Sequence, residues 1–329
     1  MKQFKTFLAP IVLSLVLISC KNYVTNVDPL VTSVEDSQLN TEKQIPFLIK
    51  GVETQFASAL CRTDVYAAGL SDALIFPINV PAIHNPRFSD IDTGKIQLNN
   101  NLIDAAYNAT GQSRFYADDL VRRTGMISFS DTSVKNNALF TGYFYGGYAR
   151  YLYASYFGLN PTQGGSPING GPFIGSNEMY DLAIGNFKES LKYLNDDLMI
   201  RTVNSVIARA YLYKGDYTNA AAFAESGMLN GDGPFLALYN SIQSNEWWAN
   251  AGALLSEFVS DFRFKSYIDT DPNEANRIKL DSVLSTDGVM YYYQTIYPES
   301  GSPQKIITWQ ENNLIRAELI LRGFGSGDA

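Results

Sequence analysis

The sequence contains few of the residues on which catalytic, metal-binding and nucleic-acid-binding sites most often depend. His84 is the one histidine among 329 residues, which excludes any site that needs two imidazoles. Two cysteines cannot build the disulfide framework of a small secreted domain. Lysine and arginine total 25 against 33 aspartates and glutamates, so no excess of basic charge is present to neutralise the phosphates of a nucleic acid.

Apolar and aromatic residues are plentiful instead. Hydrophobic residues make up 46% of the chain and charged residues 18%, a composition too apolar for disorder and sufficient for a large core. The chain has 21 tyrosines and 19 phenylalanines beside 3 tryptophans. Aromatic rings on a weakly charged surface suit the recognition of neutral ligands, although most rings in any chain lie in the core.

The N-terminus has the features of an exported, lipid-attached protein. Two lysines precede an apolar run over residues 7–18, which is too short to span a bilayer and fits a signal peptide. The run ends in Leu-Ile-Ser-Cys at 17–20 and resembles the lipobox of bacterial lipoproteins, whose cysteine is acylated and becomes the first mature residue. We therefore expect residues 1–19 to be removed and Cys20 to anchor the protein to a membrane. The alternative is an ordinary secretory signal with an incidental cysteine.

Residues 20–40 are polar and are predicted to be a tether between the lipid and the folded body, residues 41–329. Within the body, helices are predicted where apolar residues recur at helical spacing. The predicted helices are 45–61, 96–107, 114–123, 140–151, 180–194, 201–214, 217–228 and 307–321.

Three loop-rich segments interrupt these helices, at 71–95, 158–175 and 229–305. The chain is therefore predicted to be all-α dominated, with a tetratricopeptide-like helical-repeat core and an irregular loop-rich subdomain.

Residues 210–220 resemble the tetratricopeptide repeat. Ala210 and Ala220 are small enough for two antiparallel helices to approach closely, Gly215 serves the turn, and Tyr217 packs into the pair. The repeat period is only approximate along the chain, so we expect irregular repeats inside a larger fold.

Four blocks along the chain, in this order, resemble the SusD/RagB family of outer-membrane nutrient-binding lipoproteins. Residues 148–158 (YARYLYASYFG) are similar to the family's long aromatic helix, and residues 204–212 (NSVIARAYL) to its central repeat helix. Residues 260–263 (SDFR) are similar to its short Asp-x-Arg segment, and residues 308–318 (TWQENNLIRAE) to its late helix. With the lipobox, the resemblance extends over nearly the whole chain.

Two features depart from the family's pattern. Members usually continue well past the late helix, whereas this sequence ends at Ala329, so we expect the SusD-like domain to lack its C-terminal part and the helix that should cover Leu314, Ala317 and Leu321. Acidic residues often follow the cysteine of members displayed on the cell surface, but Lys21 follows it here. The sequence thus favours lipidation more strongly than outward display.

The resemblance implies a binding protein and not an enzyme. Such proteins cover a SusC-like TonB-dependent transporter in the outer membrane, capture an oligosaccharide or, in some members, a peptide, and pass it to the barrel. Aromatic faces would hold the sugar ring while amides, carboxylates and guanidinium groups bond its hydroxyls. Such recognition requires no proton transfer, cofactor or metal.

Two other functions stay open on the sequence alone. A lipid-anchored helical-repeat scaffold would bind a protein or peptide partner. A glycan-cleaving enzyme would need a pair of carboxylates, and no local motif singles out a pair among the 33 acidic residues.

The ligand residues of this family vary between members, so candidates are chosen by their chemistry and their place on loops. They are Phe76, His84, Asn85, Arg87, Trp247 and Trp248. For His84 the alternative is an ordinary polar loop residue. If the two tryptophans lie on a strand, one ring faces the core and the other faces out, and the alternative is two core rings.

Three further patterns do not indicate a site. Residues 269–273 (DTDPN) start like a calcium-binding loop, but Glu274 stands where the EF-hand needs glycine. Residues 170–175 have the glycine spacing of a P-loop without its lysine. Cys61 lies in an apolar, small-residue pattern and is predicted to be a buried structural thiol, since nothing in the sequence brings it to His84.

Overall fold

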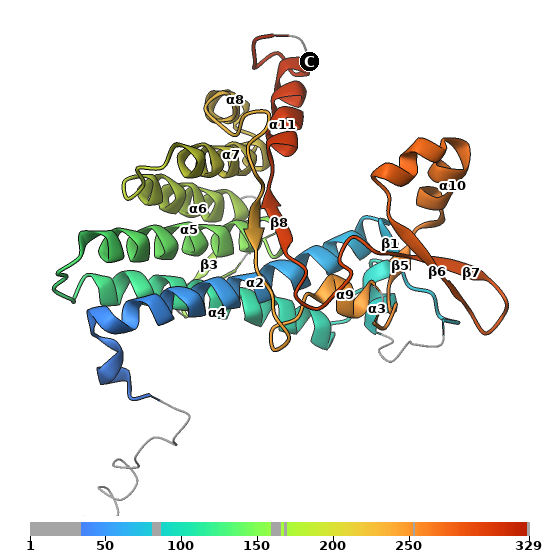
Figure 1. Cartoon of the computed structure of the whole chain (residues 1–329), viewed down its shortest axis with the longest axis horizontal. Coiled ribbons are helices and arrows are strands. Elements are labelled where there is room, and N and C mark those ends of the chain that lie inside the picture. The colour runs from blue at the N-terminus through green and yellow to red at the C-terminus, as the bar shows by residue number, and fades with distance from the viewer. Residues whose placement is uncertain (1–33, 81–86, 159–165, 168–169, 253, 328–329) are drawn as a thin grey trace, which may run out of the picture.

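The computed structural model describes residues 34–80, 87–158, 166–167, 170–252 and 254–327. Figure 1 shows a stack of long helices and, at one end of the molecule, a smaller lobe of strands and short helices. The elements are η1 (Asp36–Leu39), η2 (Glu42–Gln44), α2 (Ile45–Leu70), β1 (Leu74–Ile75), α3 (Arg87–Asp92), α4 (Asn101–Thr124), α5 (Thr132–Tyr156), β2 (Ser166–Pro167), β3 (Phe173–Ile174), α6 (Ser176–Leu191), α7 (Asp197–Lys214), α8 (Tyr217–Glu225), β4 (Phe235–Ala237), α9 (Glu246–Asn250), β5 (Val259–Ser260), α10 (Phe262–Thr270), η3 (Pro272–Asn276), β6 (Leu280–Leu284), β7 (Met290–Gln294), β8 (Gln304–Ile307) and α11 (Trp309–Leu321).

The long helices pack on their neighbours in chain order, as a helical repeat requires. α2 packs on α4, α4 on α5, α5 on α6 and α6 on α7, and the stack continues through α8 to α11 (Figure 1). One core runs through the whole stack, from Ile45 in α2 to Leu319 in α11. The predicted all-α core is therefore confirmed.

The turn between α7 and α8 has the geometry that its sequence predicts. Gly215 has a φ of 87°, a left-handed conformation that glycine adopts without steric cost. Asp216 then caps α8 by accepting a hydrogen bond from the backbone NH of Asn219 at 3.2 Å. Ala210 and Ala220 are both fully buried, which lets the two helices lie close together.

The tyrosine-rich helix α5 is buried on most sides because α2, α4, α6 and α7 all pack on it. Two glycines allow this close approach. A Cβ atom on Gly142 would lie 2.9 Å from the carbonyl oxygen of Ala117 in α4. One on Gly147 would lie 3.0 Å from the carbonyl oxygen of Ala183 in α6. α5 is thus covered by other helices on both of its faces.

Several helix predictions were too short; the helix predicted at 140–151, for example, extends over Thr132–Tyr156 as α5. The first helix continues past Cys61 to Leu70, and the two helices predicted at 96–107 and 114–123 are one helix, α4. Gly111 lies in the middle of α4 without breaking it, because one glycine only weakens a helix. Its missing side chain leaves room for a tyrosine of α5: a Cβ there would lie 2.8 Å from the hydroxyl oxygen of Tyr153.

The smaller lobe is built on an antiparallel sheet with the strand order β1-β5-β7-β6. β1 follows α2 closely, and its Leu74 pairs with Ser260 of β5, which also pairs with Tyr292 of β7. A second, smaller core lies at the junction with α2; it includes Val65, Tyr66, Leu74, Phe88, Ile91 and Phe258. Two of the segments predicted to be loop-rich thus come together in one lobe.

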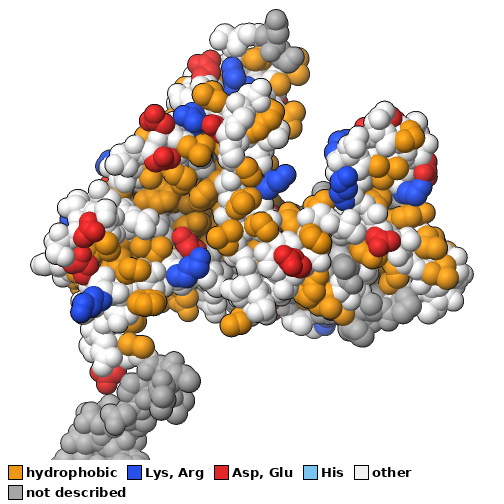
Figure 2. Space-filling view, in the orientation of Figure 1, with side chains coloured by type: hydrophobic (Ala, Val, Ile, Leu, Met, Phe, Trp, Pro, Cys, Tyr) orange, Lys and Arg blue, Asp and Glu red, His pale blue; other side chains and the backbone are white. Residues whose placement is uncertain are grey.

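The helix α11 lies on the far side of the stack from α2. Its Ile315 and Leu319 are buried, whereas Leu314 and Leu321 are 71% and 79% exposed. Figure 2 shows an open notch between the arm that ends in α11 and the lobe that contains α10. In the described ranges, no helix is both long enough and apolar enough to cross a membrane.

Candidate functional site

Three of the residues predicted from sequence, Cys20, His84 and Asn85, lie outside the described residues. Phe76 and Trp247 are half-buried and pack against the second core. Arg87 opens α3, beside the buried Phe88 of the same core. The fold therefore brings these predicted ligand residues to one region, the junction of α2 with the lobe.

The two tryptophans lie on the short helix α9 and not on a strand. The side-chain oxygen of Asn245 caps this helix by accepting hydrogen bonds from the backbone NH groups of Trp247 at 2.8 Å and Trp248 at 3.4 Å. The alternation expected on a strand does not apply here. The Trp247 ring packs against both cores and lies 6.1 Å from the Tyr297 ring centroid, so it serves the core. Trp248 is half-buried and stays a predicted ligand residue.

Cys61 is a buried structural thiol, as predicted. Its Sγ lies 3.3 Å from the side-chain oxygen of Asn245 and accepts a hydrogen bond from the backbone NH of Glu246 at 3.0 Å. Burial raises the pKa of the Cys61 thiol to about 12, so the reactive thiolate is not formed at neutral pH.

The hollow whose lining best suits a polar ligand lies in the lobe, between α10 and the β6–β7 hairpin. Its volume is about 370 Å³. Its lining residues include Lys265, Ile268, Asp281, Ser282, Tyr292 and Thr295. Basic, acidic, hydroxyl and aromatic groups thus share one small surface.

The hairpin presents its side chains in a fixed register. Asp281 pairs with Tyr293, and Ser282 pairs with Tyr292. The turn contains Gly288 at a φ of 82°, where a residue with a side chain would be strained. This turn also touches the proline-rich insert, because the backbone NH of Thr286 donates to the carbonyl oxygen of Asn79 at 2.9 Å.

Aromatic rings of the hairpin are held by α10. The Tyr291 and Phe262 ring centroids are 5.3 Å apart, and the ammonium group of Lys265 lies 5.6 Å from the Tyr292 ring centroid. Lys265 also pairs with Asp269, and this hydrogen bond raises the pKa of its ammonium. The cation beside Tyr292 therefore stays protonated at neutral pH.

A third tyrosine, Tyr293, lies on the opposite face of the hairpin from Tyr292. The hydroxyl of Tyr293 donates to the carboxylate of Asp281 at 3.1 Å. Burial and then this carboxylate raise the pKa of Tyr293, so its hydroxyl keeps its proton. In the hollow, the half-buried Tyr292 ring, the Lys265 ammonium and the Ser282 hydroxyl can together bind a hydroxylated ring through its apolar face and its polar edge.

A second polar cluster, centred on Arg209, was not predicted from the sequence. The guanidinium donates to the Tyr148 hydroxyl at 2.6 Å, the Ile306 carbonyl oxygen at 3.1 Å and the Glu311 carboxylate at 2.9 Å. The rings of Tyr148 and Tyr151 lie 5.4 and 5.3 Å from it. Since these contacts join α5, α7, β8 and α11, the cluster stabilises the fold.

Asp64 is the acidic group beneath this cluster. It accepts a hydrogen bond from the side chain of Gln304, which in turn accepts one from the Tyr239 hydroxyl at 2.9 Å. Burial raises the pKa of Asp64 to about 7, although the nearby Arg209 opposes the shift. Asp64 is thus partly protonated at neutral pH.

The sequence contained signals that could have predicted both the β6–β7 hairpin and the Arg209 cluster. Residues 285–288 (STDG) separate two strand-like runs, which is a hairpin pattern that would have placed the three tyrosines on a strand. Arg209 stands between two alanines in an apolar helix, a position where a guanidinium is buried and needs partners.

The calcium-like segment 269–273 has a structural role. Asp269 pairs with Lys265, and Asp271 caps η3 by accepting from the backbone NH of Asn273 at 3.0 Å. Across the residues described in the structure, no three histidine, cysteine, aspartate or glutamate side chains gather where they could hold a metal ion.

Solved structures with the same architecture are SusD-like proteins. A SusD superfamily protein from Bacteroides thetaiotaomicron VPI-5482 aligns with a TM-score of 0.66 at 16% identity, over 86% of this chain and 76% of that one. Surface glycan-binding protein A from Bacteroides thetaiotaomicron aligns with a TM-score of 0.65 at 10% identity, over 88% and 80% of the two chains.

A laminarin-binding SusD-like protein aligns with a TM-score of 0.63 at 10% identity, over 83% of this chain and 79% of that one. No protein-family model and no curated protein matches the sequence. The structural likeness confirms the SusD-like fold that the four sequence blocks predicted.

Proposed function

We propose that this protein binds a saccharide at the outer membrane and passes it, chemically unchanged, to a SusC-like TonB-dependent transporter. The observation that carries the proposal is the SusD-like fold, which is shared with proteins named for binding laminarin and surface glycans. The residue chemistry of the lobe agrees with such a ligand.

The proposed binding surface is the hollow between α10 and the β6–β7 hairpin. Tyr292 would lie against the apolar face of a sugar ring, and Lys265 and Ser282, which is the cross-strand partner of Tyr292, would bond its hydroxyls. The proline-rich insert contacts the turn of the same hairpin, since the side chain of Asn79 donates to the carboxylate of Asp287 at 2.6 Å.

The residues chosen from sequence extend this surface toward α2. Phe76 directly follows β1, which belongs to the same sheet as the β6–β7 hairpin. Arg87 and Trp248 lie on α3 and α9, and His84 and Asn85 belong to the same insert by sequence. We propose that they contact further sugar units of a longer chain.

The position of the protein in the cell follows from Cys20. An acylated cysteine would anchor the body in the outer membrane, within reach of a barrel embedded in the same bilayer. Pull-down from detergent-solubilised outer membrane tests this part. Co-purification of a TonB-dependent barrel supports the proposal, whereas a periplasmic enzyme or assembly factor would favour the helical-repeat scaffold.

Ligand binding is tested by native gel electrophoresis through gels that contain one soluble polysaccharide each. Laminarin, pullulan, xylan and galactomannan form a suitable panel. The proposal expects the mature chain to be retarded in at least one of these gels. Unchanged mobility in every gel would contradict saccharide binding.

A further inference from the structure

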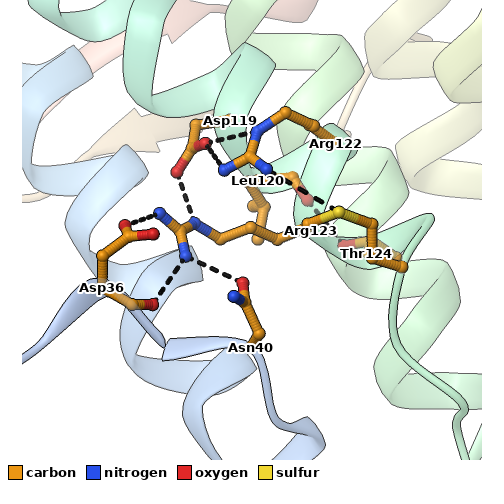
Figure 3. A network of polar contacts seen from close by, with 8 residues as sticks. Asp36, Asn40, Asp119, Leu120, Arg122, Arg123 and Thr124 are labelled. Atoms are coloured by element: carbon orange, nitrogen blue, oxygen red, sulfur yellow. Dashed lines mark hydrogen bonds and ion pairs between the residues drawn. The ribbon is translucent and has the colours of Figure 1, made fainter. Parts of the chain in front are cut away.

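The segment that leads from the tether into α2 is fastened to the end of α4 by one buried arginine (Figure 3). Arg123 is 4% exposed and donates to the backbone carbonyl of Asp36 at 3.2 Å and to the side chain of Asn40 at 2.8 Å. It also pairs with the carboxylates of Asp36 and Asp119. The path of the chain from residue 36 onward is therefore fixed on the body.

A second contact holds the next few residues. The carboxylate of Glu42 accepts hydrogen bonds from the backbone NH groups of Ser130 at 2.9 Å and Asp131 at 3.0 Å, just before α5. These bonds lower the pKa of Glu42, so it remains ionised and bonded at neutral pH. The start of the body is thus attached to both ends of the α4–α5 connection.

Exposed aromatic rings lie beside this attachment. Phe47 in α2 and Phe115 and Tyr116 in α4 are 71%, 56% and 45% exposed. They border a groove of about 290 Å³ that also touches Leu39 of η1. We call Phe47, Phe115 and Tyr116 the aromatic patch.

The groove is lined mainly by apolar side chains, so it suits an apolar surface better than a hydroxyl-rich ligand. Arg122 and Arg123 both donate to the carboxylate of Asp119, at 2.9 and 2.5 Å. The rings expose apolar surface, and transfer of this surface out of water lowers the free energy. Aromatic side chains of this kind are favoured at the interface between lipid headgroups and acyl chains.

The tether places this patch near a bilayer. Fourteen residues, 20–33, separate Cys20 from the described chain, and even fully extended they span only about 50 Å. Figure 1 places the start of α2 and the lobe with α10 at opposite ends of the long axis, so the described chain begins at the end of the body that carries the patch.

We propose that the aromatic patch docks on the surface of the bilayer that holds the Cys20 lipid and so orients the protein. This inference rests on lipid attachment at Cys20, which is part of the proposed function. The partner is the lipid surface itself and not a dissolved ligand.

Fluorescence quenching by brominated lipid tests the docking directly. Lipidated full-length mature protein is reconstituted into phosphatidylcholine vesicles with or without dibrominated acyl chains. Phe115→Trp adds a reporter to the patch, and Phe262→Trp adds a control reporter on α10; the parent protein supplies the background of Trp247, Trp248 and Trp309. We expect about twofold quenching of the added Phe115→Trp emission, since interfacial side chains reach about 5–10 Å into the bilayer, and no quenching of the control. Equal quenching of both reporters would overturn the proposal.

Substitution of the patch gives an independent measure. Mature protein with Cys20→Ser is sedimented with the same vesicles at millimolar lipid. Phe47→Ser, Phe115→Ser and Tyr116→Ser together should lower the bound fraction about tenfold, as expected for the loss of about 1.4 kcal/mol of apolar burial. The matched control, Phe173→Ser, Leu182→Ser and Leu198→Ser, removes exposed apolar residues elsewhere and should leave binding unchanged.

The outcomes separate this inference from the proposed function. If the patch substitutions leave vesicle binding unchanged but release a co-purified barrel, the patch belongs to a protein interface and the inference is wrong. Polysaccharide retardation in gels tests the ligand site alone. Mass spectrometry of Cys20 reports whether the lipid on which the inference depends is present.

Discussion

Arg209 of α7 and Glu311 of α11 are joined by a 2.9 Å ion pair across more than a hundred residues of sequence. The guanidinium is almost completely buried, whereas the carboxylate is about one-third exposed. The Arg209 guanidinium also donates hydrogen bonds to the Tyr148 hydroxyl and to the Ile306 carbonyl oxygen. This pair joins α7 to α11 close to Asp64 of α2.

Replacement of Arg209 should destabilise the fold strongly. Arg209→Met keeps the volume but leaves the Tyr148 hydroxyl and the Ile306 carbonyl without their donor, and Asp64 without its nearest cation. We expect a loss of about 3 kcal/mol in the free energy of unfolding, measured in urea. The exposed control Lys50→Met should lose about 0.5 kcal/mol or less, and equal losses for both would refute a stabilising cluster.

Asp64 should make stability depend on pH. Its pKa is raised to about 7 in the folded protein, so the folded state binds a proton that the unfolded state releases near its ordinary value of about 4. The stabilisation from this proton is present below the unfolded pKa and is lost as pH rises through the folded pKa. The difference in unfolding free energy between wild type and Asp64→Asn should therefore shift against wild type by about 1 kcal/mol per unit between about pH 5 and 7. A difference that does not vary with pH would show that Asp64 is ionised in the fold.

Because α5 and α6 approach closely, alanine substitution at two glycines should change the stability in opposite directions. Gly147→Ala would place a Cβ 2.9 Å from the Phe187 ring and 3.0 Å from the Ala183 carbonyl, which should cost about 1–3 kcal/mol of stability. Gly185→Ala in α6 meets no atom within 4 Å and should stabilise by about 0.5–1 kcal/mol. The melting temperatures of both variants, measured by thermal unfolding, test this prediction. Similar melting temperatures would mean that the helices can separate without cost.

The half-buried Tyr292 should carry more of the saccharide affinity than the exposed Tyr116. Tyr292→Ala removes the central ring of the hollow and should weaken binding about tenfold, which equals about 1.4 kcal/mol. Tyr116→Ala removes a ring at the other end of the molecule and should leave the saccharide affinity unchanged. Affinity gels compare the two variants, and equal weakening would place the site elsewhere.

The helical core was predictable from sequence because its signals are local and repeated. The spacing of apolar residues located each long helix of the stack, and Gly215 located a turn. The error at Gly111 came from a tertiary contact: the Tyr153 hydroxyl fills the space that a side chain would take, and periodicity does not report such a contact.

The site was less predictable because distant segments build it. The sheet that carries Tyr292 pairs strands near residues 74, 260, 282 and 292, and short strands have weak patterns of their own. Trp247 and Trp248 were chosen for their chemistry, but Asn245 caps them into a helix that directs one ring into the core. The capping residue Asn245 could be recognised in the sequence. Which of the two tryptophan rings would face the core could not be predicted.

Isothermal titration of the mature protein with the polysaccharide that retards it in gels tests the central claim most directly, when the recovered glycan is then sized by chromatography. The account predicts saturable binding that Tyr292→Ala weakens, with the glycan recovered at its original length. Shortened glycan after incubation, or no heat of binding with that polysaccharide, would contradict it.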